Sequence, residues 1–500
     1  MNIKQRPNIV YILADDMGYG DLSCLNPGSA FKTPHFDALA ASGMAFTDAH
    51  AASAVCTPSR YAILTGRYPW RSELKAGVLR GYSRPLIEKG RLTVASMLKD
   101  QGYQTAIVGK WHLGMGMPFH DADGSYAVSG HEWDKHPDVD YSQPISPSPN
   151  DYGFDQSFCI AASLDMPPYV YIENGRFTQI PNRMTVNTGK RYWREGPTAP
   201  DFHHEDVLPT FTQKALDVID GFGQAPFFLY FPLPAPHTPI LPSARFQGKS
   251  GTNAYGDFVL MCDDVVGQIR AKLSDNGILD NTIVIFTSDN GCSPMADFDE
   301  LMAAGHNPNY IFRGHKADIY EGGHRIPLLV SWPAVIPPLA VCNRLVSLTD
   351  FYATMAEVLS VPVPMNAAED SVSNLSLWQS PDADGVRDSA IQESIDGSLT
   401  IRQGKWKLAM CPGSGGWSYP RPGEDNTDGL PSFQLFNLEK DIGERTNVIQ
   451  AESEIASAMR IELTRQILRG RSTPGSDQPN NGAPVWEAVN WLEDADGVQL

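Results

Sequence analysis

The chain has 500 residues, a formal net charge of −19 at pH 7 and a hydrophobic fraction of 42%. This length predicts a large core and more than one domain. The acidic balance excludes a broad nucleic-acid-binding surface, which needs clustered Lys and Arg, but it permits a small anionic substrate, because salt screens charges beyond about 8–10 Å.

The N-terminal residues carry no recognisable export signal. Residues 1–7 (MNIKQRP) lead straight into an apolar run, without the separate apolar region and cleavage site of a signal peptide. No apolar run reaches the roughly 18 residues of a membrane span. The seven cysteines include no C-x-x-C pair, which is typical of a reducing compartment. We expect a cytoplasmic protein as the chain stands, or a periplasmic or secreted one if a native signal was trimmed.

Apolar runs alternate with helix-period segments over the first two thirds of the chain. The runs are 9–14 (IVYILA), 105–108 (TAIV), 227–231 (FFLYF) and 282–287 (TIVIFT), and helical patterns cover 92–98, 211–219 and 258–273. Strands that are apolar throughout are buried on both faces. The sequence therefore predicts an α/β fold with a large, mostly parallel central sheet and helices on both faces.

The pattern changes from about residue 351. A helical segment at 351–359 and a polar linker at 367–374 precede strand-like pieces at 399–402, 406–410 and 434–436, and an amphipathic helix at 453–468. These elements predict a smaller C-terminal α+β domain. We expect the N-terminal domain to span 1–365 and the smaller domain with its tail to span 366–500.

Polar side chains follow each of the four apolar runs. Asp15 and Asp16 follow the first, Lys110 and His112 the second, His237 the third, and Asp289 and Asn290 the fourth. Ligands of open parallel sheets bind outside the carboxyl ends of the strands, so these side chains are expected to meet in one crevice.

The acids and the amide in this set suit a hard cation. Asp15, Asp16, Asp289 and Asn290 supply the oxygen ligands that Ca²⁺ or Mg²⁺ prefers. Such residues are also common turn residues after strands, and for either pair alone that interpretation has at least equal weight. Two pairs after two buried strands favour a metal site.

The basic side chains of this set also have both a catalytic and a purely structural interpretation. Lys110 and Lys316 can each hold an oxyanion, and His112 and His237 can move a proton near neutral pH. Singly, such a lysine is more often solvated and such a histidine more often structural. Beside a metal and a bound anion their catalytic interpretation gains weight.

Cys56 lies in the stretch VCTPSR, just before Pro58, which is well placed to open a helix. A buried structural thiol, a thiolate nucleophile favoured by the helix N-terminus, and a precursor of another group are all open. A thiolate is poorly matched to a hard cation, which prefers oxygen. That mismatch favours an oxygen-bearing group made from the cysteine.

The stretch from Cys56 to Arg60 matches the C-x-P-x-R signature of type I, formylglycine-dependent sulfatases, an arylsulfatase-like family of the alkaline phosphatase superfamily. NIVYILADDMGYGD, GKWHLG, APHTP, TSDNG and GHKADIYEGGHRIP resemble further family blocks in family order. GKWKL and LFNLEKD resemble the smaller C-terminal domain of the family. The resemblance implies a catalytic N-terminal sulfatase domain and a sulfuric ester hydrolase, with a sulfated carbohydrate as substrate and small aryl sulfates as artificial ones.

The resemblance also implies roles for individual residues. A maturating enzyme would oxidise Cys56 to formylglycine, and calcium, rather than magnesium, would be held by the residue at position 56 with Asp15, Asp16, Asp289 and Asn290. Arg60 would steady the formylglycine, and Lys110 and Lys316 would contact sulfate. One hydroxyl of the hydrated aldehyde would attack sulfur, His237 would protonate the leaving alcohol, and His112 would deprotonate the second hydroxyl so that sulfate is eliminated.

Substrate-binding candidates lie in the loops. Asp165, Tyr169, His306 and Asn309 could contact a sugar, although ordinary loop surface is the simpler interpretation for each. The polar insertion at 115–150 could also contribute, but the spacing of His120, His131 and His136 matches no standard metal pattern. Two rival functions remain open, a phosphonate or phosphodiester hydrolase with the same machinery and a noncatalytic glycan-binding module. The oligomeric state is not predicted.

Overall fold

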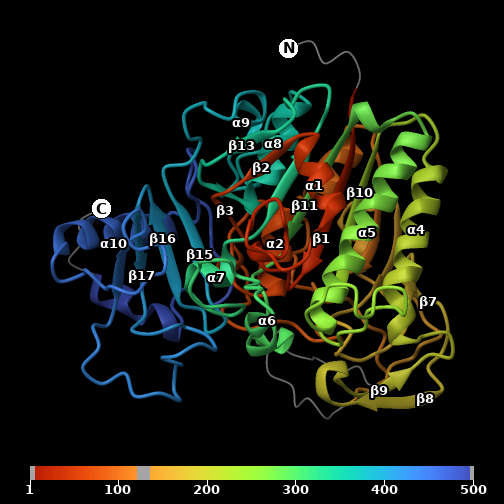
Figure 1. The fold of residues 1–500 in the computed structure, drawn as a ribbon, viewed down its shortest axis with the longest axis horizontal. Coiled ribbons are helices and arrows are strands. Elements are labelled where there is room, and N and C mark those ends of the chain that lie inside the picture. The colour runs from red at the N-terminus through yellow and green to blue at the C-terminus, as the bar shows by residue number, and fades with distance from the viewer. Residues whose placement is uncertain (1–5, 121–135, 496–500) are drawn as a thin grey trace.

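The computed structural model describes residues 6–120 and 136–495 (Figure 1). Its centre is a ten-stranded sheet of order β13-β2-β12-β11-β1-β10-β4-β5-β6-β7. The five middle strands run parallel, as predicted. They are β11 (Thr282–Ser288), β1 (Asn8–Asp15), β10 (Phe227–Pro236), β4 (Gln104–Lys110) and β5 (Gln156–Ile160).

Antiparallel pairs extend the sheet on both sides. β12 (Leu328–Ser331) pairs antiparallel with β11 and with β2 (Met44–Phe46), and β13 (Ala340–Cys342) pairs parallel with β2. On the other side, β6 (Ile172–Glu173) pairs antiparallel with β5 and with β7 (Arg176–Phe177). The sheet is therefore mixed at its edges and parallel where the four predicted strands lie.

Alternate residues of β1 enter two separate cores. Ile9, Tyr11 and Leu13 pack into one core, and Val10, Ile12 and Ala14 pack into the other. All six are buried because helices cover both faces of the sheet. This is the physical reason for the unbroken apolar run in the sequence.

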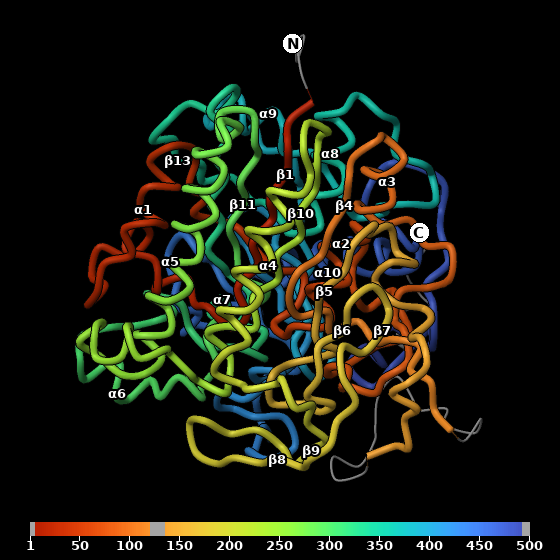
Figure 2. The backbone as a smooth tube through the Cα atoms, turned by 90° about the vertical axis from the view of Figure 1, so that its right-hand side faces the viewer, coloured from red at the N-terminus to blue at the C-terminus, as the bar shows by residue number. Residues whose placement is uncertain are grey.

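The covering helices form one layer on each face (Figures 1 and 2). α2 (Cys56–Thr65), α3 (Val94–Asp100), α8 (Phe351–Val358) and α9 (Leu375–Gln379) pack into the first core. α1 (Pro34–Ala41), α4 (Val207–Gly221) and α5 (Ala254–Asp275) pack into the second. The predicted helices are confirmed, with one shift, because α2 begins at Cys56 itself rather than at Pro58.

A four-stranded antiparallel sheet forms the smaller C-terminal part, drawn in blue in Figure 1. Its strands are β15 (Ala390–Glu393), β16 (Leu399–Gln403), β17 (Trp406–Ala409) and β18 (Gln434–Asn437), and α10 (Ser453–Leu468) packs on it. The boundary at residue 365 stays a prediction. The packing of α9 into the main core shows that some chain beyond residue 365 belongs structurally to the large sheet.

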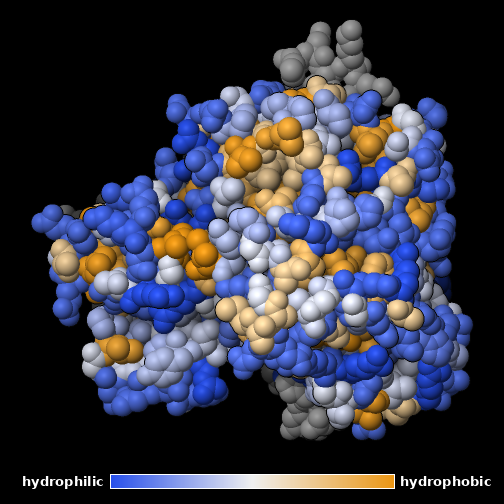
Figure 3. All heavy atoms as spheres, in the orientation of Figure 1, coloured by the Kyte–Doolittle hydropathy of each residue, from blue (hydrophilic) through white to orange (hydrophobic). Residues whose placement is uncertain are grey.

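Short elements surround the lower edge of the main sheet in Figure 1. They are the hairpin of β8 (Arg183–Asn187) and β9 (Trp193–Thr198), with α6 (Phe298–Ala303) and α7 (Glu321–His324). β3 (Ala49–His50) and β14 (Val346–Ser347) form a separate small parallel pair. The surface in Figure 3 is mostly hydrophilic, with small scattered apolar groups. Among the described residues, no helix has the length and apolar composition needed to cross a membrane.

Candidate active site

The carboxyl ends of four parallel strands meet at the lower edge of the sheet in Figure 1. Asp15 ends β1, Lys110 ends β4, His237 follows β10 and Asp289 follows β11. Lys110 Nζ lies 2.7 Å from Asp15 Oδ2, and His237 Nε2 lies 3.5 Å from Asp16 Oδ2. The predicted convergence of these segments is confirmed.

Two glycines let the loop with Lys316 approach the end of β11. A Cβ atom on Gly291 would lie 1.8 Å from the Gly322 carbonyl oxygen, so no larger residue fits. The backbone N–H of Lys316 donates to the Cys292 carbonyl over 2.9 Å. These contacts bring Lys316 within 2.6 Å of Asp16 Oδ1, although the two residues are 300 positions apart.

Three buried cations balance three buried carboxylates. Arg60 donates from Nε and Nη2 to Asp289 Oδ2 over 3.0 and 2.7 Å, and Lys110 and Lys316 pair with Asp15 and Asp16. The formal charge of this group is zero, so a divalent cation would give it an excess of positive charge suited to an anionic substrate.

The pKa values of two of these carboxyl groups diverge. Burial favours the neutral form of Asp15, but Lys110, His237 and Arg60 outweigh it and hold the pKa of that carboxyl well below its usual range. Burial raises the pKa of Asp289 to about 6, against the effect of Arg60 and with the support of the Asp15 charge. Two acids in one site with opposite shifts are typical of a functional centre.

The donor atoms fit a hard cation. Ligand atoms of Asp15, Cys56 and Asp289 all lie within 4.8 Å of one another. Within the described residues, Asp15 Oδ1 and Asn290 Oδ1 are buried without a hydrogen-bond donor. Buried oxygen acceptors without partners are costly, and a bound Ca²⁺ would satisfy them.

Cys56 is the first residue of α2 and is only 2% exposed. Burial raises the pKa of its thiol above the ordinary value, although the charges of Lys110 and Lys316 lower it. An unmodified Cys56 is therefore a neutral thiol near pH 7, which disfavours the interpretation as a thiolate nucleophile.

His112 is held as a neutral imidazole. Its Nε2 donates to the Leu79 carbonyl over 2.8 Å, while the buried Nδ1 has no hydrogen-bond partner within the described residues. Burial and the nearby Lys110 charge hold the pKa of His112 well below its usual value. The residue has a φ of 58°, an uncommon left-handed conformation that is concentrated at functional sites. Nδ1 is thus available as a proton acceptor.

His237 lies at the more open side of the group. It is 9% exposed and Lys316 5%, whereas Arg60, Lys110 and His112 are completely buried. His237 Nδ1 is 2.5 Å from the Thr238 carbonyl oxygen, so it donates there and Nε2 is directed to the site. Substrate access is therefore expected on the side of His237 and Lys316.

The four predicted sugar-binding residues have partners inside the protein. Asp165 pairs with Arg194, and the Tyr169 hydroxyl donates to the Arg194 carbonyl over 2.7 Å. His306 Nε2 lies 2.9 Å from Asp21 Oδ1, and Asn309 Nδ2 donates to the Gly314 carbonyl over 2.8 Å. These contacts favour a supporting role in the loops, and a role in binding stays a prediction. Part of the polar insertion, with His131, lies outside the described residues.

Sequence reasoning missed residues that position the loops of the predicted catalytic side chains. Thr57 Oγ1 donates to the His112 carbonyl over 3.0 Å and accepts from the Leu79 N–H over 3.2 Å. Asp318 accepts from the N–H groups of Trp417 and Ser418 over 2.8 and 2.9 Å, which ties the C-terminal part to the loop with Lys316. Thr57 is one of the two variable positions of the signature and Asp318 lies in a polar loop, so neither gives a signal in a single sequence.

A second group of metal-binding side chains is neutralised by a lysine. His50, Glu321 and His324 could together hold an ion. Lys407 Nζ lies 3.1 Å from both Glu321 Oε1 and His324 Nε2, and 2.8 Å from Glu444 Oε1. The ammonium group therefore supplies the positive charge that a metal would otherwise bring.

Comparison with known proteins supports one family. A sequence profile described as Sulfatase matches residues 7–361. The N-acetylgalactosamine-6-O-sulfatase of Bacteroides thetaiotaomicron is 36% identical over 90% of this chain and 91% of its own, and arylsulfatase A of Bos taurus is 31% identical over 95% and 91%.

Solved structures agree with this match. A structure from a study of glycosaminoglycan metabolism by Bacteroides thetaiotaomicron is similar with a TM-score of 0.79 at 33% identity, covering 93% of this chain and 99% of its own. Phosphonate monoester hydrolase of Agrobacterium radiobacter has the same fold, with a TM-score of 0.58 at 19% identity over 93% and 95% of the two chains.

Proposed function

This chain belongs to the sulfatase family and is a sulfuric ester hydrolase, and we propose that it removes sulfate from a sulfated carbohydrate through a formylglycine made from Cys56. A maturating enzyme of the host would perform that oxidation. The observation that carries the proposal is the setting of Cys56. It is a buried neutral thiol at a helix N-terminus, among three carboxylates and three cations.

Two groups would complete the site. Asp15, Asp16, Asp289 and Asn290, with the residue at position 56, would hold Ca²⁺, which supplies positive charge for the nonbridging oxygens when bound, and formylglycine supplies a hydrated aldehyde with two hydroxyls. Mg²⁺ fits less well, because it demands a small octahedral site and keeps several waters.

The side chains of the protein bind and orient the sulfate group. Lys110 pairs with Asp15 and Lys316 with Asp16, each within 2.7 Å of a carboxylate oxygen, and the sulfate group would be held beside these two ammonium groups. Arg60 is fixed by Asp289 and by the Lys110 carbonyl, 3.1 Å away, and holds positive charge beneath residue 56. Such preorganised charges stabilise the charge that develops in the transition state.

Proton transfer is divided between the two histidines. Neutral His112 accepts a proton at Nδ1 from a hydroxyl of residue 56, because its Nε2 is committed to the Leu79 carbonyl. His237, at the more open side, donates a proton from Nε2 to the departing alcohol oxygen. The carbohydrate part of the substrate therefore leaves on the His237 side.

Phosphonate or phosphodiester hydrolysis is the second candidate activity of this site, supported by the fold that the chain shares with the Agrobacterium enzyme. Turnover of 4-nitrophenyl sulfate and bis(4-nitrophenyl) phosphate by one preparation compares the two candidates. A higher kcat/KM for the phosphodiester would favour the second.

The test of the proposal is the mass of the peptide that contains residue 56, measured with turnover. Protein made together with a formylglycine-generating enzyme should carry an aldehyde or its hydrate there and cleave sulfate esters. Cys56→Ala should lose turnover while keeping its melting temperature. Full turnover by protein with intact cysteine would overturn the formylglycine mechanism. Glycan binding without turnover by the matured wild type would favour a binding module. The cytoplasmic location stays a prediction.

A further inference from the structure

A cavity of about 740 Å³ lies between the β8–β9 hairpin, α6 and the loop before Lys316. Its volume is within the range of small-molecule sites, roughly 300–1,000 Å³. Its lining includes Lys190, Tyr192, Met295, Asp297, Phe298 and His315.

Each segment of the lining is joined to a catalytic segment. Lys190 accepts, at its carbonyl oxygen, a hydrogen bond of 3.0 Å from the N–H of Ile240, three residues after His237. Met295 and Phe298 follow β11 and Asn290 by a short loop, and His315 directly precedes Lys316. The lining thus continues along the chain into the segments of His237 and Lys316, which are the most exposed members of the predicted site.

The wall formed by His315 is rigid. Its Nδ1 lies 2.9 Å from the Lys316 carbonyl oxygen and its Nε2 lies 3.1 Å from Ser418 Oγ. Both nitrogens are engaged, so the ring presents an aromatic surface, tilted against Phe298 with centroids 5.8 Å apart. A binding surface that is already ordered saves the entropy cost of ordering it on binding.

The charges of the lining select against a second sulfate group. Lys190 Nζ is 3.1 Å from Asp297 Oδ2 and 2.5 Å from Glu300 Oε2, so it is neutralised twice. Asp299 adds another carboxylate to the lining. An additional sulfate placed here would meet more negative than positive charge. The half-buried rings of Tyr192 and Phe298 instead suit the apolar face of a sugar ring.

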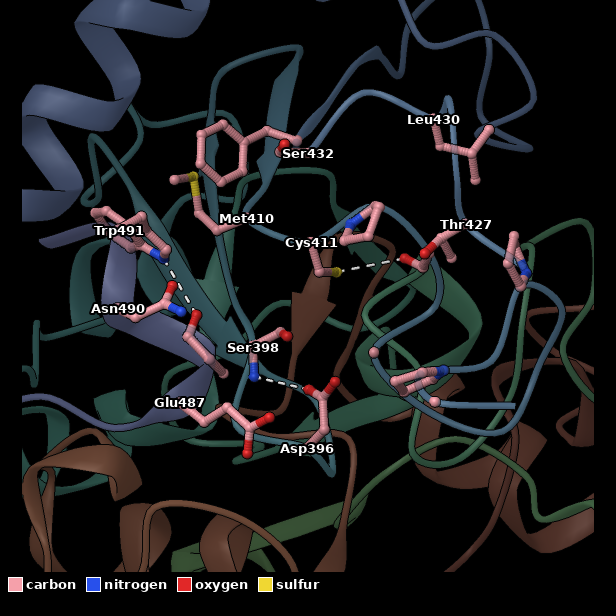
Figure 4. A pocket seen from close by; sticks show the side chains of 18 residues that line it. Asp396, Ser398, Met410, Cys411, Thr427, Leu430, Ser432, Glu487, Asn490 and Trp491 are labelled. Atoms are coloured by element: carbon pink, nitrogen blue, oxygen red, sulfur yellow. Dashed lines mark hydrogen bonds between the residues drawn. The ribbon is translucent and has the colours of Figure 1, made fainter. Parts of the chain in front are cut away.

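A larger cavity, about 800 Å³, lies in the C-terminal part of the chain (Figure 4). Its lining, which includes Asp396, Phe433, Glu487 and Trp491, comes from the C-terminal part of the chain. Neither cavity is lined by a predicted catalytic residue itself, but only the smaller one is lined by a sequence neighbour of such a residue, since His315 directly precedes Lys316. The cavity beside His315 is therefore the better candidate for the substrate.

We propose that the cavity lined by Tyr192, Phe298 and His315 is the leaving-group subsite and holds the ring of a singly sulfated sugar. The proposal rests on the proposed function, because it assigns the cavity to the alcohol part of the ester. The sulfate group lies on the lysines, and the sugar extends past His237 into the cavity with its apolar face on the aromatic rings.

The test compares inhibition by the two halves of the ester. N-acetylgalactosamine and inorganic sulfate are used as competitive inhibitors of the matured wild type and of the cavity variants Tyr192→Ala and Phe298→Ala. The control variant is Tyr419→Ala, because the ring of Tyr419 is 71% exposed and lies outside this cavity. Loss of one stacking contact should raise the inhibition constant of the sugar about tenfold in the two cavity variants. The inhibition constant of sulfate should stay within about twofold, since the sulfate position is unchanged. The control should match the wild type for both.

An unchanged inhibition constant of the sugar in both cavity variants would overturn the proposal, as would an equal rise for sulfate. N-acetylgalactosamine 4,6-disulfate should be a poorer substrate than the 6-sulfate in the wild type, and the reverse order would contradict the charge argument. Failure of the proposed function is seen separately, as absence of turnover of any sulfate ester by the matured wild type. Calorimetric binding of the sugar to the same variants then tests the cavity without turnover.

Discussion

Lys407 is a buried cation that joins the two parts of the chain, and its removal should lower the stability of the fold. It lies on β17, is completely buried, and pairs with Glu321 of α7 over 3.1 Å and with Glu444 over 2.8 Å. Lys407→Met keeps the length of the side chain and leaves both carboxylates without their shared cation. Breaking a buried ion pair on one side costs about 3–5 kcal/mol, so we expect a loss of this size in the free energy of unfolding.

The loss should depend on pH. Burial raises the pKa of Glu444 to about 7, against the charge of Lys407, whereas the pKa of Glu321 is held well below its usual range because Lys407 and neighbouring cations outweigh the effect of burial. Without Lys407 both glutamates bind protons more readily in the folded state, so the loss is smaller at acid pH and grows as pH rises.

Urea unfolding followed by tryptophan fluorescence, at about pH 8 and about pH 5.5, measures both effects. Lys405→Met is the matched control, since its side chain is 42% exposed and 3.8 Å from Glu439, and exposed pairs contribute only about 0–1 kcal/mol. Glu444→Gln added to Lys407→Met should recover part of the stability. Equal losses for the two lysine variants at pH 8, or no recovery in the double variant, would refute the reasoning.

Three further predictions concern the site and the core. His237→Ala should lower kcat for a sugar sulfate by about 10²–10⁴-fold and kcat for 4-nitrophenyl sulfate much less, because a nitrophenolate leaves without a proton. Comparable losses of kcat for both substrates would contradict the role of His237. Treatment with EDTA should abolish turnover and lower the melting temperature of the wild type, and Ca²⁺ should restore both better than Mg²⁺. The melting temperature of Asp289→Asn should change neither with EDTA nor with added metal. Burial raises the pKa of Asp263 to about 6, so this carboxyl binds a proton in the folded state that the unfolded chain releases at lower pH. The wild type should therefore lose stability relative to Asp263→Asn as pH rises from about 4 to 6, with no further change above pH 6. A constant difference between the urea midpoints of the two proteins across this range would count against the raised pKa of Asp263.

The sequence by itself determined the parallel centre of the main sheet and predicted the set of catalytic side chains. An unbroken apolar run such as residues 9–14 is stable only when both faces of the strand are covered, so it predicts an interior parallel strand with little ambiguity. Parallel strands end at one edge, which is why Asp15, Lys110, His237 and Asp289 could be expected to meet before any contact was known. The signature from Cys56 to Arg60 is local in sequence and needs no tertiary context to be recognised.

Only the tertiary structure decided which polar residues serve which partner. Asp165 and His306 have the same loop setting in the sequence as a ligand-binding residue, yet they pair with Arg194 and Asp21. Nothing in the sequence distinguishes Lys407 from other lysines. In the fold, β17 places it against Glu321, 86 positions away. The aromatic cavity beside His315 depends equally on chain segments that meet only after folding. A polar side chain in a loop has the same local sequence pattern whether solvent, a buried charge or a substrate lies beside it. Long-range contacts determine which of these neighbours it has, and such contacts leave no local periodicity in the sequence.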